Sequence, residues 1–247
     1  MPPYELVSFD DGFRFYTQSP AEARFQYEEM FEHGCYARVT LPARPFVIDA
    51  GANVGLFSLY VKQRNPDAEI LAFEPMPESL GALRMNLELH GLEGVTVENC
   101  ALGSAAESDV PFTYYPVIPA NSTRHPGEKE LQKKVLTPTL GHAFTTMMHE
   151  GTEVRVPVER LSRFLDDRDH VDLLKVDVEG AELDVLLGLD PDDWRKIDQV
   201  VLEVQDMEGR LDGIASLLRD HGLPPVVEPA PLMPEELLTY VVHATRP

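Results

Sequence analysis

One stretch, Pro45 to Leu59, constrains the fold more than any other part of the sequence. An apolar run over 46–50 is followed by a turn of small residues and then by apolar residues at helical spacing, which predicts a buried parallel strand, a turn and a helix over 54–64. Gly51 and Gly55 lack a Cβ atom, so a ligand can approach the turn closely. The free N–H groups at the start of the helix point towards that ligand. The stretch therefore predicts a unit that binds a small molecule.

Strand and helix signals alternate along most of the chain. Strands are predicted at 46–50, 70–73, 95–97, 171–177 and 197–204, and helices at 54–64, 78–90, 182–188 and 211–221. Repeated strand–helix units favour a parallel sheet covered by helices on both faces. The last extended segments, 226–227 and 237–243, are expected to close the sheet as an antiparallel pair. We therefore predict an α/β, Rossmann-like fold with a mostly parallel, seven-stranded sheet.

Two segments interrupt this alternation within the single domain, 1–247, that the chain length predicts. The expected parts are an N-terminal extension or cap at 1–44, a Rossmann-like core at 45–103 and 160–247, and an insertion at 104–159. The extension is predicted to hold a hairpin over 8–16 and a helix over 21–34. The insertion contains a polar, proline-containing stretch at 116–134, which is expected to be irregular and to act as a substrate lid.

The composition is strongly acidic, with 42 Asp and Glu against 21 Lys and Arg and a net charge of −21. Such a surface repels phosphate backbones and anionic lipids, so we expect no nucleic acid and no membrane as partner. The two cysteines, Cys35 and Cys100, suggest neither a disulfide framework nor a zinc site. The segment Met1 to Leu6 lacks the pattern of a leader peptide, so a cytoplasmic location is expected. A homodimer is compatible with these features.

The turns after the strands carry the candidate binding residues, because ligands of open α/β sheets lie beyond the carboxyl ends of the strands. Asp49 ends the first strand, where a carboxylate would repel a phosphate but suits an ammonium group. Glu74 ends the second strand and can accept hydrogen bonds from both ribose hydroxyls. Ala101 and Leu102 follow the third strand and suit one face of an adenine. These features together indicate S-adenosylmethionine.

The turn after the first strand also separates this cofactor from a nicotinamide dinucleotide. In the dinucleotide fingerprint G-x-G-x-x-G, with Gly51 as the first glycine, Asn53 and Leu56 would occupy the other two glycine positions. The turn fits instead the methyltransferase pattern acidic-x-Gly-x-Gly-x-Gly, with Asn53 replacing the middle glycine. We therefore predict that Asp49, Gly51, Asn53 and Gly55 bind the cofactor.

The candidate catalytic residues lie after the fourth and fifth strands. Methyl transfer to a hydroxyl is an in-line displacement that also requires removal of a proton. Asp177 and Glu179 follow the fourth strand, and Glu203 ends the fifth; each could be a base, a metal ligand or an ammonium clamp. Asp177 is also expected to contact the methionine part of the cofactor. Lys175 is expected to pair with a carboxylate.

Two alternatives for the chemistry remain open. A histidine of the insertion could be the base, delivered by a lid; the candidates are His125, His142 and His149. Asp177, Glu203 and Asp206 could hold a divalent metal ion through oxygen ligands. Spacing alone does not show that three carboxylates converge, so a metal is not favoured and no metal ligand is assigned.

The chain resembles FkbM-type methyltransferases in a series of motifs. These are Val47 to Gly55, Phe73-Glu74-Pro75, Ala101-Leu102-Gly103, Leu174 to Glu182 and Val201 to Val204, preceded by Glu29-Met30-Phe31 with Tyr36. The resemblance covers roughly residues 25 to 205, and its most specific part is Lys-x-Asp-x-Glu-Gly-x-Glu, beginning at Lys175. The resemblance implies a class I Rossmann-like methyltransferase, and it implies an acceptor of the kind usual in this family, a hydroxyl group of a natural product, sugar or lipid. Arg160-Leu161-Ser162 departs from the Thr-Leu-Asp common in that family.

The functional prediction combines the turn residues with this resemblance. We expect an S-adenosylmethionine-dependent methyltransferase that methylates a hydroxyl group on a small-molecule natural product or sugar. N-methylation of a small amine is the alternative within enzymes, since an acidic surface tolerates amines. A non-catalytic module that only binds the cofactor is the alternative outside them.

Overall fold

The computed structural model describes residues 4–247. The first three residues of the predicted extension, which begin the segment Met1 to Leu6, lie outside the described residues. The strands of the central sheet are β3 (Phe46–Ala50), β4 (Glu69–Phe73), β5 (Val95–Glu98), β9 (Leu173–Val176), β10 (Gln199–Gln205), β11 (Pro225–Pro229) and β12 (Thr239–Thr245).

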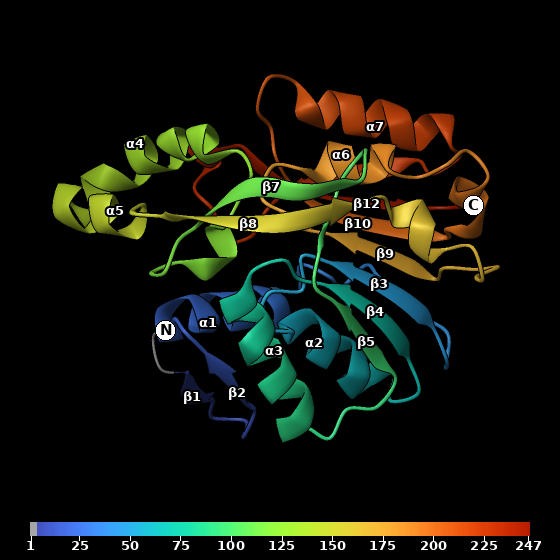
Figure 1. Cartoon of the computed structure of the whole chain (residues 1–247), viewed down its shortest axis with the longest axis horizontal. Helices are drawn as coiled ribbons and strands as arrows, with labels where there is room; N and C mark the ends of the chain where they lie inside the picture. Colours follow the sequence, from blue (N-terminus) through green and yellow to red (C-terminus); the bar gives the residue numbers. More distant parts are fainter. Residues whose placement is uncertain (1–3) are drawn as a thin grey trace.

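The central sheet has seven strands in the order β5-β4-β3-β9-β10-β12-β11 (Figure 1). Neighbouring strands are parallel except around β12, which is antiparallel to both β10 and β11. The predicted α/β fold and the antiparallel closure by the last two strands are therefore confirmed. Strand order reverses between β3 and β9, because β4 and β5 continue on one side and β10 on the other. Ligands bind at such a switch point in this class of sheet.

Helices cover both faces of the sheet, as predicted (Figure 1). They are α2 (Leu56–Arg64) and α3 (Pro77–Leu89) on one face and α6 (Glu182–Leu187) and α7 (Arg210–Asp220) on the other. Successive strand residues point to opposite faces, so neighbours on β3 enter different cores. Val47 packs in the cluster that contains Leu59 and Leu83, and Ile48 packs in the cluster that contains Leu218. Burial on both faces explains why these strands read as continuous apolar runs.

The N-terminal extension forms the predicted hairpin and helix, with one difference. The hairpin is β1 (Glu5–Ser8) with β2 (Arg14–Thr17), and α1 (Pro20–Tyr27) runs directly into the π-helix η1 (Glu28–Glu32). Asn86 of α3 fastens this cap to the core: its side chain exchanges hydrogen bonds with the backbone of Tyr16 on β2 and donates to the carbonyl oxygen of Val54, at 2.6–2.9 Å. The cap is therefore held beside the turn that follows β3.

The insertion is more regular than predicted. Its strands β7 (Glu107–Tyr114) and β8 (Thr152–Glu159) form a separate three-stranded sheet together with β6 (Ala101–Leu102), which lies just before the insertion. Between β7 and β8 lie the short 3₁₀ helices η2 (Pro119–Asn121) and η3 (Pro126–Glu128), then α4 (Lys129–Leu140) and α5 (His142–Met148). The prediction of an irregular stretch at 116–134 is wrong beyond Glu128. Three prolines within these helices, Pro119, Pro126 and Pro138, hide the helical pattern, because proline is typical of turns.

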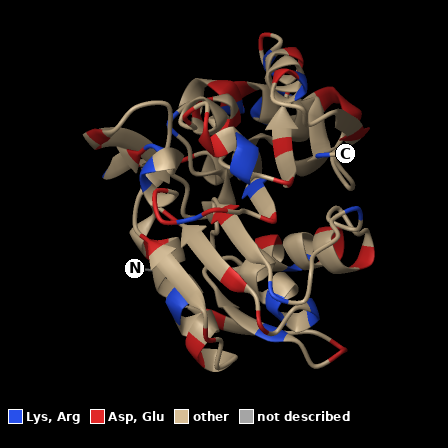
Figure 2. Cartoon of the chain, turned by 90° about the vertical axis from the view of Figure 1, so that its right-hand side faces the viewer, with Lys and Arg blue, Asp and Glu red and all other residues tan. Residues whose placement is uncertain are grey.

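The remaining short elements are 3₁₀ helices: η4 (Leu161–Phe164), η5 (Asp193–Lys196) and η6 (Glu235–Leu237). Figure 2 shows Asp and Glu on most elements in view, with Lys and Arg between them, so the net charge of −21 is spread over the fold. Among residues 4–247, no helix has the length and the apolar composition that crossing a membrane requires.

Candidate functional site

The turn between β3 and α2 is shaped by three residues with positive φ: Gly51 at +81°, Asn53 at +48° and Gly55 at +85°. A Cβ atom on Gly51 would lie 1.8 Å from the backbone carbonyl oxygen of Asp177, at the end of β9. The glycine is therefore required by the chain's own close packing, in addition to any ligand. Gly55 is the left-handed residue before α2, so the helix begins at Leu56 instead of residue 54.

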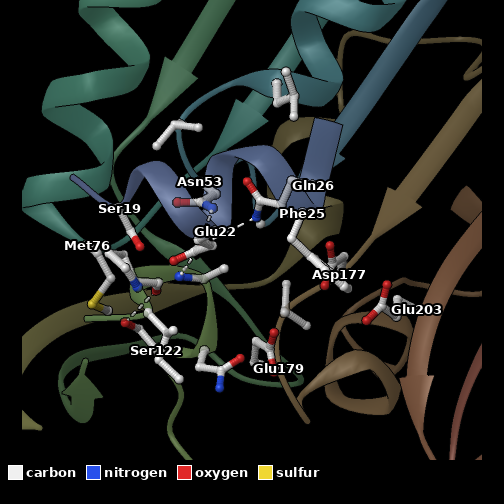
Figure 3. Close-up of a pocket in the computed structure, with 18 of the residues that line it drawn as sticks. Ser19, Glu22, Phe25, Gln26, Asn53, Met76, Ser122, Asp177, Glu179 and Glu203 are labelled. Atoms are coloured by element: carbon white, nitrogen blue, oxygen red, sulfur yellow. Dashed lines mark hydrogen bonds between the residues drawn. The ribbon is translucent and has the colours of Figure 1, made fainter. Parts of the chain in front are cut away.

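A cavity of about 790 Å³ lies over the carboxyl ends of β3, β4, β9 and β10, beneath the cap and the insertion (Figure 3). This volume lies within the range of about 300–1,000 Å³ that is usual for ligand sites. The predicted residues on its wall are Gly51, Asn53, Glu74, Ala101, Leu102, Asp177, Glu179 and Glu203. Asp49 and Gly55 are not among the residues that line the wall, so a part for these two in cofactor binding stays a prediction.

Asp49 neutralises the buried Lys175, whose side chain forms part of the wall. Its Oδ1 lies 3.2 Å from Nζ of Lys175, and its Oδ2 accepts a hydrogen bond from Ser58 at 2.8 Å. Lys175 also donates to the carbonyl oxygen of Gly51 at 2.8 Å, and it lines the cavity. The predicted carboxylate partner of Lys175 is therefore confirmed. Nearby carboxylates outweigh burial and raise the pKa of Lys175, with Asp49 as the largest favourable contribution.

Glu74 is held rigidly at the wall by two backbone N–H groups. Asn53 donates to its Oε2 and Met76 donates to its Oε1, each at 2.7 Å. A carboxylate oxygen can accept two hydrogen bonds, so each oxygen keeps one free position. Burial raises the pKa of Glu74 to about 7, although the two N–H donors oppose this shift. The arrangement suits a ligand that brings hydroxyl donors to both oxygens.

Two acidic residues of the cap reach the cavity, and sequence reasoning assigned neither of them to the site. Glu22 of α1 accepts hydrogen bonds through Oε1 from the backbone N–H of Ala120 at 2.9 Å and from Nδ2 of Asn53 at 3.4 Å (Figure 3). It thus joins the cap, the insertion and the turn after β3. Glu29 lies on η1 and also lines the cavity. Burial raises the pKa of both carboxyls to about 8. The Glu29-Met30-Phe31 motif was the only sequence signal.

The predicted catalytic residues Asp177, Glu179 and Glu203 surround one end of the cavity (Figure 3). They do not share one environment. Asp177 is partly exposed and lies 3.7 Å from Nζ of Lys175. Burial raises the pKa of Glu203 well above its usual value, and the charge of Asp177 raises it further.

Glu179 is tied to the insertion, which argues against a free base at this position. Its carboxylate makes a short hydrogen bond with the buried ammonium group of Lys129, and its carbonyl oxygen accepts one from Thr123 at 2.6 Å. Among the described residues, His125, His142 and His149 of the insertion do not line the cavity. The ring nitrogens of His149 are hydrogen-bonded to the carbonyl oxygen of Thr145 and to the side chain of Gln132.

The carboxylates considered for a metal do not form one ligand set. In the described part of the chain, the only group of three acidic, histidine or cysteine side chains close enough to share an ion is His170, Asp172 and Asp198. These residues lie near the amino ends of β9 and β10, opposite the cavity. Asp206, which was considered together with Asp177 and Glu203, accepts a hydrogen bond from the backbone N–H of Leu211 at the start of α7.

The wall has an excess of acceptors, which fits the predicted cofactor. Glu22 Oε2, Glu29 Oε1 and Asn53 Oδ1 are buried and lack a hydrogen-bond partner within residues 4–247. Buried acceptors without donors are costly, so a bound ligand that supplies donors or positive charge is favoured. S-adenosylmethionine carries an ammonium group, a sulfonium centre, ribose hydroxyls and an adenine amino group. The residues present therefore fit this cofactor.

Comparison with known proteins finds relatives among methyltransferases. The sequence pattern described as the Methyltransferase FkbM domain matches residues 49–223. The chain is 39% identical to "Methyltransferase 1" of Beauveria bassiana (strain ARSEF 2860) over 247 residues, 98% of each chain. It is 36% identical to "31-O-demethyl-FK506 methyltransferase FkbM" of Streptomyces tacrolimicus over 241 residues, 92% of each.

A solved structure supports the fold alone. The crystal structure of methyltransferase FkbM from Methylobacillus flagellatus KT superposes with a TM-score of 0.56 at 14% identity, covering 91% of this chain and 51% of that one. The family match extends over most of the sheet and includes the turn after β3, Glu74 and the Lys175 to Glu182 block. The chain belongs to the FkbM family of S-adenosylmethionine-dependent methyltransferases.

Proposed function

We propose that the protein transfers the methyl group of S-adenosylmethionine to a hydroxyl group on a bulky, largely apolar small molecule. The observation that carries the proposal is a cavity wall made of two sets of side chains, which we call its polar part and its apolar part. The polar part contains Asn53, Glu74 and the carboxylates at the strand ends. The apolar part is lined by side chains from the insertion and from the segment before β12: Leu136, Leu140, Phe144, Met148, Leu232, Met233 and Leu237.

The polar part supplies what the cofactor needs. Glu74 would accept the ribose hydroxyls, Ala101 and Leu102 would face the adenine, and Asp177 would face the ammonium group. When bound, S-adenosylmethionine supplies a methyl group on a positively charged sulfur. Lys175 shares its charge between Asp49 and Asp177, so the end of the cavity near the reaction is not left with two uncompensated carboxylates.

The apolar part indicates the acceptor. Leu140, Phe144 and Leu232 line the cavity and are 41–44% exposed, so apolar side chains extend from the cavity wall to the protein surface. Such a surface favours a ligand that removes apolar area from water, at about 25 cal/mol for each Å² buried. It gives a sugar few hydrogen-bonding groups. The relative from Streptomyces tacrolimicus is named for methylation at an oxygen atom, which supports a hydroxyl as the reacting group.

A panel of acceptors tests the proposal. The protein would be incubated with S-adenosylmethionine and with 31-O-demethyl-FK506, cyclohexanol, cyclohexylamine or glucose, and products would be identified by mass spectrometry. We expect a methyl ether and S-adenosylhomocysteine from an apolar alcohol and neither from glucose. Methylation of the amine alone would overturn the choice of oxygen. Calorimetry with S-adenosylmethionine is the independent check: no binding by the wild type, or equal binding by Glu74→Ala, would overturn the cofactor site.

A further inference from the structure

The acidic side chains around the reacting end of the cavity differ in what compensates their charge. Asp177 has Lys175 at 3.7 Å, and Glu179 is paired with Lys129. A carboxylate that is already paired with a lysine is a weaker proton acceptor, because the cation stabilises the charged form. These two predicted catalytic residues are therefore poor candidates for the group that takes a proton from the acceptor.

Glu29 and Glu203 are the cavity-lining carboxyls at this end that make no ion pair and no side-chain hydrogen bond within residues 4–247. Of the two, Glu29 has the stronger evidence for a functional role. Its Oε1 is buried without a partner, a costly state that needs an explanation. It also lies on the π-helix η1. Turns of π-helix are rare in proteins overall, and many of those that occur are found at functional sites.

The surroundings of Glu29 favour a switch between its neutral and charged forms. Burial, then the charges of Asp177 and Glu179, raise its pKa to about 8. The other titratable groups whose charges interact with it are Glu203, Cys35 and Tyr36. A positive charge placed in the cavity lowers the pKa of a carboxyl beside it. An effective base has a pKa near the working pH, and this site meets that condition.

We propose that Glu29, which the N-terminal cap supplies, is the general base for methyl transfer. Glu203 is the neighbouring carboxyl with which Glu29 shares one negative charge. The inference rests on the proposed function. In the step, the acceptor O–H bond breaks and its proton passes to the Glu29 carboxylate. The acceptor oxygen forms a bond to the methyl carbon while the carbon–sulfur bond breaks, and that electron pair stays on sulfur. Glu29 then returns its proton to solvent.

Two substitutions on the same π-helix test the proposal. Glu29→Gln keeps the shape of the side chain but removes the base, and Glu28→Gln is the matched control because Glu28 is exposed. The assay uses the panel alcohol that the wild type methylates fastest. We expect Glu29→Gln to lower kcat by about 10²–10⁴-fold, and Glu28→Gln to leave it unchanged. The wild-type rate should rise with pH to a plateau, and Glu29→Gln should lose that rise.

Further measurements separate catalysis from folding and binding. Calorimetry with S-adenosylhomocysteine should give the same Kd for the wild type and Glu29→Gln. If Glu29→Gln does not fold, Glu29→Asp decides: a lower kcat that keeps the rise with pH supports the proposal, and a wild-type kcat overturns it. A wild-type rate and pH profile in Glu29→Gln overturn this proposal alone. A wild-type protein that binds S-adenosylhomocysteine but methylates no alcohol overturns the proposed function, and this proposal with it.

Discussion

Replacing Lys175 by methionine should destabilise the protein strongly, because the substitution leaves a carboxylate buried without its cation. Lys175 is 3% exposed and Asp49 is 0% exposed, and their nearest charged atoms lie 3.2 Å apart. After the substitution Asp49 would keep only the hydrogen bond from Ser58. Breaking a buried ion pair in this way typically costs about 3–5 kcal/mol of unfolding free energy.

This cost can be tested as a coupling energy. For a chain of this size about 1 kcal/mol shifts Tm by about 2–4 °C, so Lys175→Met should lower Tm by roughly 6–20 °C. The double variant Asp49→Asn, Lys175→Met removes both charges and should recover most of the loss, since a neutral buried pair carries no desolvated charge. Urea unfolding followed by circular dichroism gives the free energies of the wild type, both single variants and the double variant.

An exposed pair with the same separation is the control. Arg195 and Asp192 also have their nearest charged atoms 3.2 Å apart, but their side chains are 82% and 87% exposed. Arg195→Gln should therefore change the unfolding free energy by less than about 1 kcal/mol. The reasoning is refuted if Lys175→Met costs no more than Arg195→Gln, or if the double variant is as unstable as the two single losses added together.

Three further predictions concern backbone, pH and acceptor. Gly51→Ala should be far less stable than Gly12→Ala in thermal unfolding: both positions have φ near +80°, but an added Cβ meets the backbone of Asp177 only at Gly51. Without ligand, the unfolding free energy should fall as pH rises from about 5 to 8, because burial raises the pKa of Glu22 to about 8 and the folded state holds a proton that the unfolded state releases. Glu22→Gln should make this fall less steep by removing one of the buried carboxyls with a raised pKa. Phe144→Ser should raise KM for an apolar alcohol several-fold while Met147→Ser does not, since the two side chains are 44% and 43% exposed but only Phe144 lines the cavity.

The sequence was sufficient to predict the strands of the central sheet and the cavity-lining residues at the ends of those strands. Apolar runs such as 46–50 and 70–73 are buried on both faces, so their composition alone identifies them as strands. Asn53 and Glu74 were assigned to one site from the strand ends, and the structure links them by a 2.7 Å hydrogen bond. Local pattern and topology together determine such neighbours.

Contacts between segments that are distant in the sequence could not be predicted from the sequence alone. Glu22 meets Ala120 across 98 positions of sequence, and no spacing rule connects a cap helix with a loop of the insertion. Asp49 was given to the cofactor because its position fits that role; only the tertiary structure shows that Lys175 on the neighbouring strand occupies it. For α4, Pro138 lies inside the last turn and obscured the helical pattern.

The outer strand β11 has a consequence for how the protein behaves at high concentration. An edge strand with Val226 and Val227 exposed is a template for aggregation through strand pairing. Here the strand begins and ends with proline, Pro225 and Pro229, which have no N–H to donate to an incoming strand. Glu228 between them is bound by Arg38 through two hydrogen bonds. The sheet thus ends in a strand that offers a second molecule few donors and a charged side chain, which protects it against growth into a larger assembly.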